Sequence, residues 1–128
     1  MSLEALAEVR RVLRPDGLYV ANIADATTFD FARPIVATMR SIFGEVAMLA
    51  EPSVMRGRRF GNLVLVGADA GLPHADLRRR AARAVPPVRL VEGAAVTTFV
   101  GDAVPQTDAA PVSAPPVPGW AHPRDDRP

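Results

Sequence analysis

Asn22 and Asp25 are polar residues at the end of a short apolar run, "LYVANIAD", near the beginning of the sequence. If that run is a strand of an open α/β sheet, both residues lie near its carboxyl end, where ligands of such sheets bind. We therefore predict that Asn22 and Asp25 line the edge of a substrate cleft. The alternative is that Asp25, like Thr27 two residues later, is an ordinary loop or capping group, because such side chains often bind nearby backbone.

Arginine occurs in two clusters that could contact acidic molecules. The first consists of Arg56, Arg58 and Arg59, and the second of Arg78, Arg79, Arg80 and Arg83. The first cluster could contact an acidic substrate or a partner chain, but a solvated, charged loop is the commoner explanation. For the second we favour a solvated helix face over a nucleic-acid site, because the formal net charge is only +1 and aromatic neighbours for base stacking are absent. We expect no nucleic-acid binding.

Several kinds of catalytic site are excluded by what the sequence lacks. Without cysteine there is no disulfide, thiolate ligand or cysteine nucleophile, and without lysine there is no P-loop or Schiff-base amine. His74 and His122 are too few and too far apart for a histidine-built metal site, so we expect no metal. Asp30, Glu45 and Glu51 do not have the spacing of a recognisable acid/base pair.

The sequence also bears on membrane contact and location. No apolar run approaches the roughly 18 to 20 residues needed to span a bilayer. The N-terminal stretch "MSLEALAEVRR" is charged and amphipathic, unlike a signal peptide. We expect no membrane association and a cytoplasmic location.

The first third of the chain predicts a helix, a strand and a second helix. Apolar residues spaced three and four apart indicate a helix over residues 3–13, which Ser2 can cap and a Pro-Asp-Gly turn ends. Residues 18–23 are typical of a strand covered on both faces. Pro34 lacks an N–H and must lie in the first turn of the second helix, which Gly44 ends.

The rest of the patterned sequence predicts two more strands, a helix and an irregular extension. Residues 46–50 and 62–68 are the strands, and the second is apolar and β-branched enough to be interior. The connection of about eleven residues between them has no helical period, so it cannot supply the crossover helix of a parallel pair, and we predict antiparallel pairing. A short helix over 74–85 follows, and residues 88–103 add a strand and a helical turn.

These elements define a mixed α/β domain with the order helix, strand, helix, strand, strand, in which the last two strands are an antiparallel pair. We assign residues 1–104 to this domain. Residues 105–128 include seven prolines and show almost no apolar periodicity, so we predict a disordered tail. Within the tail, Trp120 is either idle or a short linear anchor.

Two stretches of the sequence resemble a known family. "EALAEVRRVLRPDGLYVANIAD" and "RSIFGEVAMLAEPSVMRGRRFGNLVLVGAD" are similar to the C-terminal half of spermidine-synthase-like proteins, the polyamine aminopropyltransferase family. The resemblance covers roughly Leu3 to Asp108 and implies a partial Rossmann-like, class I S-adenosylmethionine-dependent methyltransferase fold. In it, "VLRPDGLYVANI" would be the helix and strand after the fourth strand, and "FGNLVLVGAD" would be the last, antiparallel strand.

The resemblance also implies where the chemistry of the family lies. The family holds its nucleoside, decarboxylated S-adenosylmethionine or S-adenosylmethionine, with a glycine-rich loop after the first strand and an acidic residue after the second. Its catalytic aspartate follows the fourth strand. This sequence contains no G-x-G and none of those positions, so no catalytic or cofactor-binding residue can be carried over.

Two hypotheses of different classes follow. The first is a fragment of a spermidine-synthase-like aminopropyltransferase or methyltransferase that lacks the nucleoside-binding and catalytic half and is inactive alone. The second is a non-catalytic half-domain that works by pairing with itself or with another chain, such as the missing N-terminal half. The strand Leu18–Ile23 would be the pairing edge, because without its neighbour it presents unpaired backbone groups.

Overall fold

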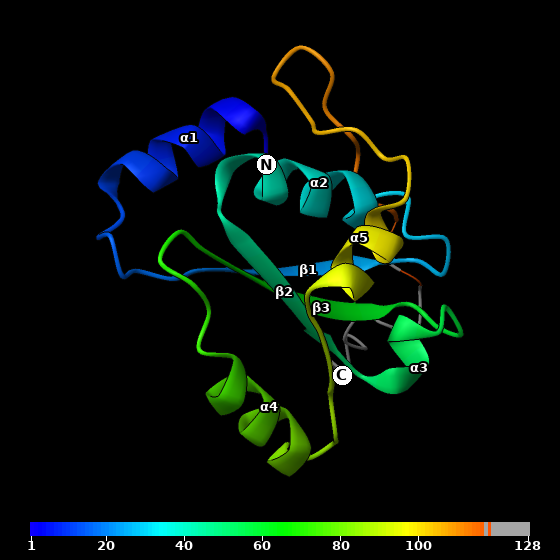
Figure 1. Ribbon diagram of the computed structural model, residues 1–128. Coiled ribbons are helices and arrows are strands. Elements are labelled where there is room, and N and C mark those ends of the chain that lie inside the picture. The colour runs from blue at the N-terminus through cyan, green and yellow to red at the C-terminus, as the bar shows by residue number, and fades with distance from the viewer. Residues whose placement is uncertain (117, 119–128) are drawn as a thin grey trace, which may run out of the picture.

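A four-stranded sheet forms the centre of the structure, with helices on both of its faces (Figure 1). The structure is a computed structural model that describes residues 1–116 and 118, so Trp120 and His122 lie outside the described residues. The elements are α1 (Leu3–Val12), β1 (Tyr19–Asp25), α2 (Ala32–Ile42), β2 (Glu45–Ala50), α3 (Pro52–Met55), β3 (Gly61–Ala68), α4 (His74–Arg83), β4 (Arg89–Val91) and α5 (Ala94–Val100).

The strands lie in the order β1-β3-β2-β4, and every neighbouring pair is antiparallel. Val20 of β1 faces Val66 of β3 across one ladder, and Val46 of β2 faces Gly67 across the next. Since β1 and β2 both run opposite to β3, they point in the same direction without touching. The mixed α/β class, the antiparallel pairing of the second and third strands and the interior place of the third are confirmed.

The larger core lies between the sheet and helices α1, α2 and α5. Leu6 of α1, Ile35 and Met39 of α2, and Leu63 and Leu65 of β3 are each at most 1% exposed. Burial of side chains of this size stabilises the folded state by about 1.5–3 kcal/mol each. The four-residue spacing of the two α2 side chains is the helical periodicity that the sequence displays.

The opposite face of the sheet is only partly covered. Helix α4 and the turn before it cover a smaller cluster that includes Ala47, Val66 and Leu72. No described helix reaches β1 on this side, so Val20 is 57% exposed and Leu18 is 43% exposed. The prediction that this strand is covered on both faces is wrong for the described chain.

The ends of the first two helices agree with their sequence signals. The Ser2 hydroxyl accepts the N–H of Ala5 at 3.2 Å, and Pro34 lies in the first turn of α2. The chain between β2 and β3, for which no helix was expected, contains α3, a single helical turn. One turn is too short for a parallel crossover, so the antiparallel pairing is unaffected. Within the described ranges, no helix has the length and apolarity to cross a membrane.

Residues 103–112, here called the C-terminal strap, lie against α1 and α2. Gln106 is buried, its N–H donates to the Thr38 hydroxyl at 2.8 Å, and its carbonyl accepts the N–H of Leu3 at 2.9 Å. The start of the predicted disordered tail at residue 105 therefore falls inside the packed structure. These bonds attach the strap because the first N–H groups of a helix and a buried threonine hydroxyl both need partners.

Candidate functional site

Asp25, predicted to line a substrate cleft, is a buried capping group in the structure. It lies at the end of β1, is 1% exposed, and one of its oxygens accepts the N–H of Ala26 at 2.7 Å. The other oxygen accepts the N–H groups of Phe31 at 3.1 Å and Ala32 at 2.6 Å, at the beginning of α2. A carboxylate here satisfies N–H groups that have no partner within the helix and complements the positive end of its dipole. These contacts describe the alternative role, a cap, and leave no oxygen free.

Asn22 and Thr27 lie apart from the Asp25 carboxylate. Asn22 is exposed on β1 and lies an odd number of residues from Asp25, so the two side chains project from opposite faces of the strand. Thr27 is exposed in the following loop, where its carbonyl approaches Gly57 so closely that a Cβ at that glycine would lie 2.9 Å from the oxygen. Because Gly57 also has a φ of +66°, this contact requires glycine. The two predicted cleft residues are therefore not brought together.

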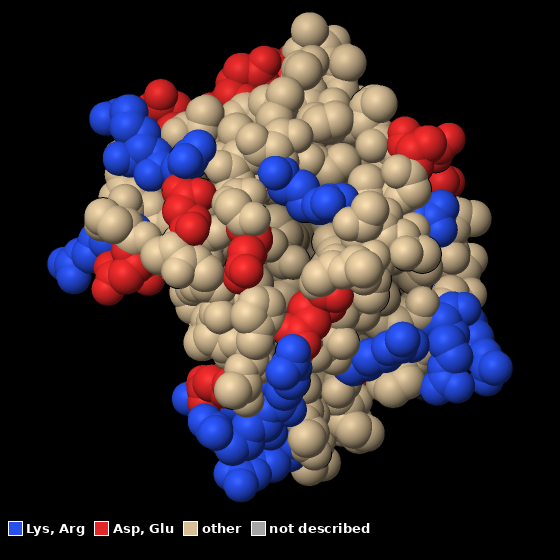
Figure 2. All heavy atoms as spheres, viewed as in Figure 1, with Lys and Arg blue, Asp and Glu red and all other residues tan. Residues whose placement is uncertain are grey.

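The two arginine clusters are mainly paired within the chain. Figure 2 shows basic side chains gathered over α4 and near α3. In the loop after α3, Arg59 pairs with Glu51 and also donates to the Ser53 hydroxyl, at 2.9 Å. On α4, Arg79 and Arg80 both bind Asp76. These contacts are typical of a solvated surface whose charges are partly neutralised by neighbouring side chains.

A cluster that the sequence did not reveal joins α4 to the sheet, and we call it the His74 cluster. His74 begins α4, and its Nε2 lies 3.0 Å from a Glu45 oxygen on β2, while its Nδ1 contacts Glu92 just after β4. Arg78 donates to the other Glu92 oxygen at 2.6 Å, and the Leu72 N–H donates to Glu45 at 2.7 Å. No group of three or more His, Cys, Asp or Glu side chains among the described residues is arranged to hold a metal ion.

The titration of this cluster is shifted by its own contacts. The hydrogen bond to Glu92, followed by the one to Glu45, raises the pKa of His74 above its usual 6.5. The hydrogen bond from His74 lowers the pKa of Glu92 below 4.5, and the Leu72 N–H, followed by His74, lowers that of Glu45. All three shifts favour a protonated imidazole between two carboxylates.

We expect the free energy of unfolding to be greatest between about pH 5 and 6.5. The raised His74 pKa stabilises the fold below about 6.5 and is lost as pH rises through the folded-state pKa. The lowered pKa values of the two glutamates stabilise it above about 4.5 and are lost as pH falls. Urea unfolding at a series of pH values measures this profile. In a His74→Gln variant the decline above pH 6.5 should flatten; an unchanged decline would show that other groups cause it.

The sequence contained no signal for this cluster. Glu45 and Glu92 lie 29 and 18 residues from His74, on segments that only the antiparallel pairing of β2 with β4 brings together. From the sequence, His74 is a candidate only for a metal ligand and Glu45 only for half of a carboxylate pair, and neither role brings an imidazole to a glutamate.

Comparison with known proteins gives one informative match. No family model matches the chain, and no curated protein does. The crystal structure of a probable spermidine synthase from Corynebacterium glutamicum ATCC 13032 is similar, with a TM-score of 0.74 and 30% sequence identity. The match covers 91% of this chain and 43% of that one. The chain spans less than half the length of this neighbour. It therefore has a spermidine synthase-like fold that corresponds to part of that protein.

Proposed function

We propose that the chain is one part of a spermidine synthase-like transferase domain, the part that contains this antiparallel sheet. It lacks the half that binds the nucleoside and carries out catalysis. The structural match supports this, since it takes in nearly all of this chain and under half of the neighbour. The contacts of Asp25 support it as well, because both oxygens of this carboxylate at the end of β1 accept backbone N–H groups, one from Ala26 and the other from the start of α2. On this proposal the chain is inactive alone.

The complete domain would act on decarboxylated S-adenosylmethionine or S-adenosylmethionine, transferring an aminopropyl or a methyl group. The described residues do not fit such a cofactor. Their glycines occur singly, with no G-x-G loop to admit a nucleoside close to backbone, and Asp25 has no free oxygen for ribose hydroxyls. We therefore assign no step of the transfer to this chain.

Calorimetric titration with methylthioadenosine, a product-like nucleoside, tests this proposal. We expect no saturable heat from the purified chain once its cooperative thermal unfolding shows that it is folded. The Corynebacterium glutamicum neighbour, titrated in the same way, serves as the complete-domain control. Saturable micromolar binding to the chain alone, equivalent to about 8 kcal/mol, would overturn the proposal by showing a nucleoside pocket within these residues.

A second candidate function rests on the free edge of β1. This strand is the outermost of the sheet, and no described strand pairs with its outer side. Leu18, just before the strand, and Val20, within it, are exposed. The same sheet face carries an open groove of about 310 Å³, lined mainly by apolar residues: Leu49, Ala50, Glu51, Asn62, Val64 and Val88. A free edge next to apolar surface favours addition of a strand, so we propose a half-domain that pairs with a second copy or with the missing N-terminal half.

A further inference from the structure

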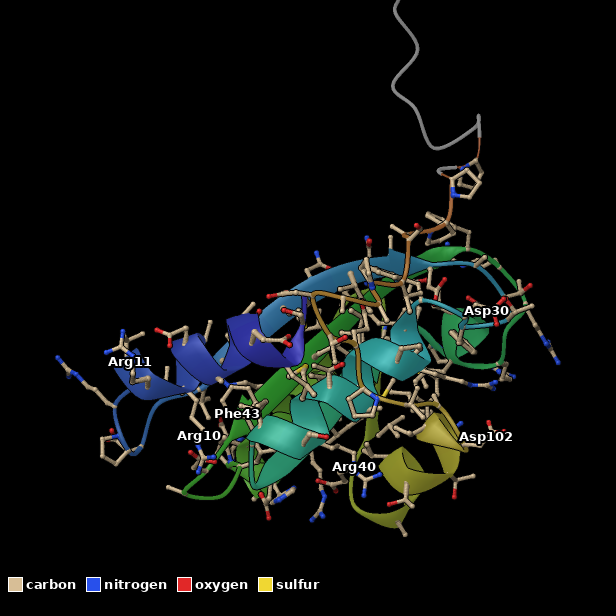
Figure 3. The ribbon with its side chains drawn as sticks, turned by 90° about the horizontal axis from the view of Figure 1, so that it is seen from above. Arg10, Arg11, Asp30, Arg40, Phe43 and Asp102 are labelled. Atoms are coloured by element: carbon tan, nitrogen blue, oxygen red, sulfur yellow. The ribbon has the colours of Figure 1, made fainter. Side chains whose placement is uncertain are left out.

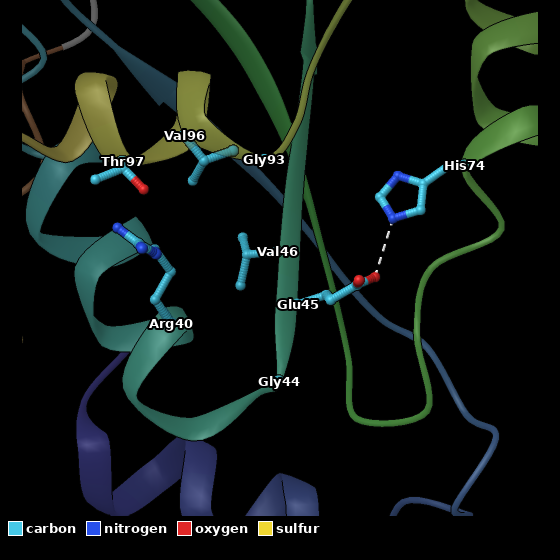
Figure 4. Close-up of a pocket in the computed structure, with 8 residues that line it drawn as sticks. All are labelled: Arg40, Gly44, Glu45, Val46, His74, Gly93, Val96 and Thr97. Carbon is cyan, nitrogen blue, oxygen red and sulfur yellow. Dashed lines mark hydrogen bonds and ion pairs between the residues drawn. The ribbon is translucent and has the colours of Figure 1, made fainter.

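The sheet opens into a cavity on the side of β2 that faces β4. Strand β4 pairs with β2 only at Met48, Leu49 and Ala50, and the chain then turns away into α5. The first three residues of β2 pair with β3 on one side and, within the described residues, with no strand on the other. Beside these residues lies a cavity of about 350 Å³, a volume within the range of small-ligand sites (Figure 4).

One wall of this cavity carries a cation that nothing in the described chain neutralises. Arg40, near the end of α2, lines the cavity and points toward Thr97 of α5 (Figure 4). Both side chains are exposed, and neither makes a hydrogen bond or ion pair with the described residues, in contrast to Arg10, which pairs with Asp69 at 2.7 Å. In Figure 3 Arg40 projects from α2 on the same side of the molecule as α5. A guanidinium beside a hydroxyl is suited to bind a carboxylate.

The floor and the far wall restrict what else the ligand can carry. Val46 and Val96 point into the space and are both buried, so they offer an apolar floor to a short aliphatic group. On the other side of β2, Glu45 and His74 also line the cavity. Glu45 and the protonated His74 pair with each other, so this side of the cavity offers no further cation to the second negative charge of an anion such as phosphate.

From this arrangement we propose that the cavity binds a small monocarboxylate with a short aliphatic chain, its carboxylate held by Arg40 and Thr97 and its carbons against Val46 and Val96. Such a site is independent of the proposed transferase role, because none of its residues belongs to the end of β1. The proposed site would be a second binding site, formed by residues other than Asn22 and Asp25 of the predicted cleft.

An NMR titration of the full chain with sodium butanoate tests the proposal. We expect saturable amide shifts at Gly44, Val46 and Thr97 with a millimolar dissociation constant. Arg40→Met, which keeps the aliphatic part of the side chain, should weaken binding at least tenfold. Arg14→Met is the matched control, since Arg14 is also exposed and forms no ion pair with the described residues, and this variant should bind butanoate like the original chain.

Two further ligands and one further variant sharpen the result. Butylammonium should not bind, inorganic phosphate should bind more weakly than butanoate, and Thr97→Val should weaken butanoate binding without changing the fold. The proposal is overturned if butanoate causes no saturable shifts, if the shifts lie elsewhere, or if Arg40→Met binds as well as the original chain. Phosphate binding as strong as that of butanoate would overturn the choice of a monocarboxylate.

Discussion

Replacing Asp25 with alanine is expected to lower the free energy of unfolding by about 3 kcal/mol. The carboxylate is buried and accepts three backbone N–H groups, those of Ala26, Phe31 and Ala32. Alanine leaves these donors without their partner, and two of them are at the start of α2, where the helix supplies none. Urea unfolding monitored by circular dichroism measures the change.

Two variants show whether the loss comes from the hydrogen bonds. Asp25→Asn keeps one acceptor oxygen and should lose less than Asp25→Ala. Asp30→Ala removes a carboxylate from the loop that follows Asp25, but the Asp30 side chain is exposed (Figure 3). Within the described residues it accepts only the Thr28 hydroxyl, so the effect should stay within about 0.5 kcal/mol. If Asp25→Ala were as mild as Asp30→Ala, the capping role would be refuted and a cleft role for Asp25 would regain support.

Replacing Val20 with lysine is expected to abolish self-association of the chain if its function is pairing through β1. At tens of micromolar the original chain should sediment as a dimer, and the variant as a monomer, with dimer affinity reduced at least tenfold. Val20 is 57% exposed on the outermost strand, so a lysine is tolerated in the monomer but would have to be desolvated next to an added strand. Analytical ultracentrifugation measures the change.

Val85→Lys provides the matched control, because it is the same substitution at a site away from β1. Val85 is 96% exposed and lies after α4. It should dimerise like the original chain. An original chain that stays monomeric and soluble at high concentration counts against pairing with itself. It leaves pairing with a missing half to be tested by adding that half as a separate polypeptide.

Most of the fold could be predicted because its signals are local. The apolar spacing of α1, the position of Pro34 and the β-branched run of β3 each specify an element from a few neighbouring residues. The antiparallel pairing of β2 with β3 followed from a connection that has no helical period and so cannot supply the crossover helix of a parallel pair. The exposed face of Val20 was missed because a short apolar run looks the same whether or not a helix covers it, and coverage depends on where distant helices lie.

The candidate sites were harder to predict, because side-chain chemistry here depends on contacts across the sheet. An aspartate at the end of a strand can face a ligand or cap the next helix, and only the position of α2 decides between them. The His74 cluster and the cavity beside Arg40 both form where β4 leaves β2, a divergence that no residue type marks in the sequence.

The hydrogen bond between Leu3 and Gln106 gives the first N–H of α1 a protein partner only late in translation. Leu3 emerges from the ribosome about a hundred residues before Gln106, which at ordinary elongation rates is about 5 to 20 s of synthesis. Throughout that interval the first N–H of α1 has only water as a partner. Strand β1 likewise has no pairing strand until β3 has been synthesised. A nascent chain arrested before residue 106 should therefore expose α1 to proteases and chaperones, although every residue of α1 has already been synthesised.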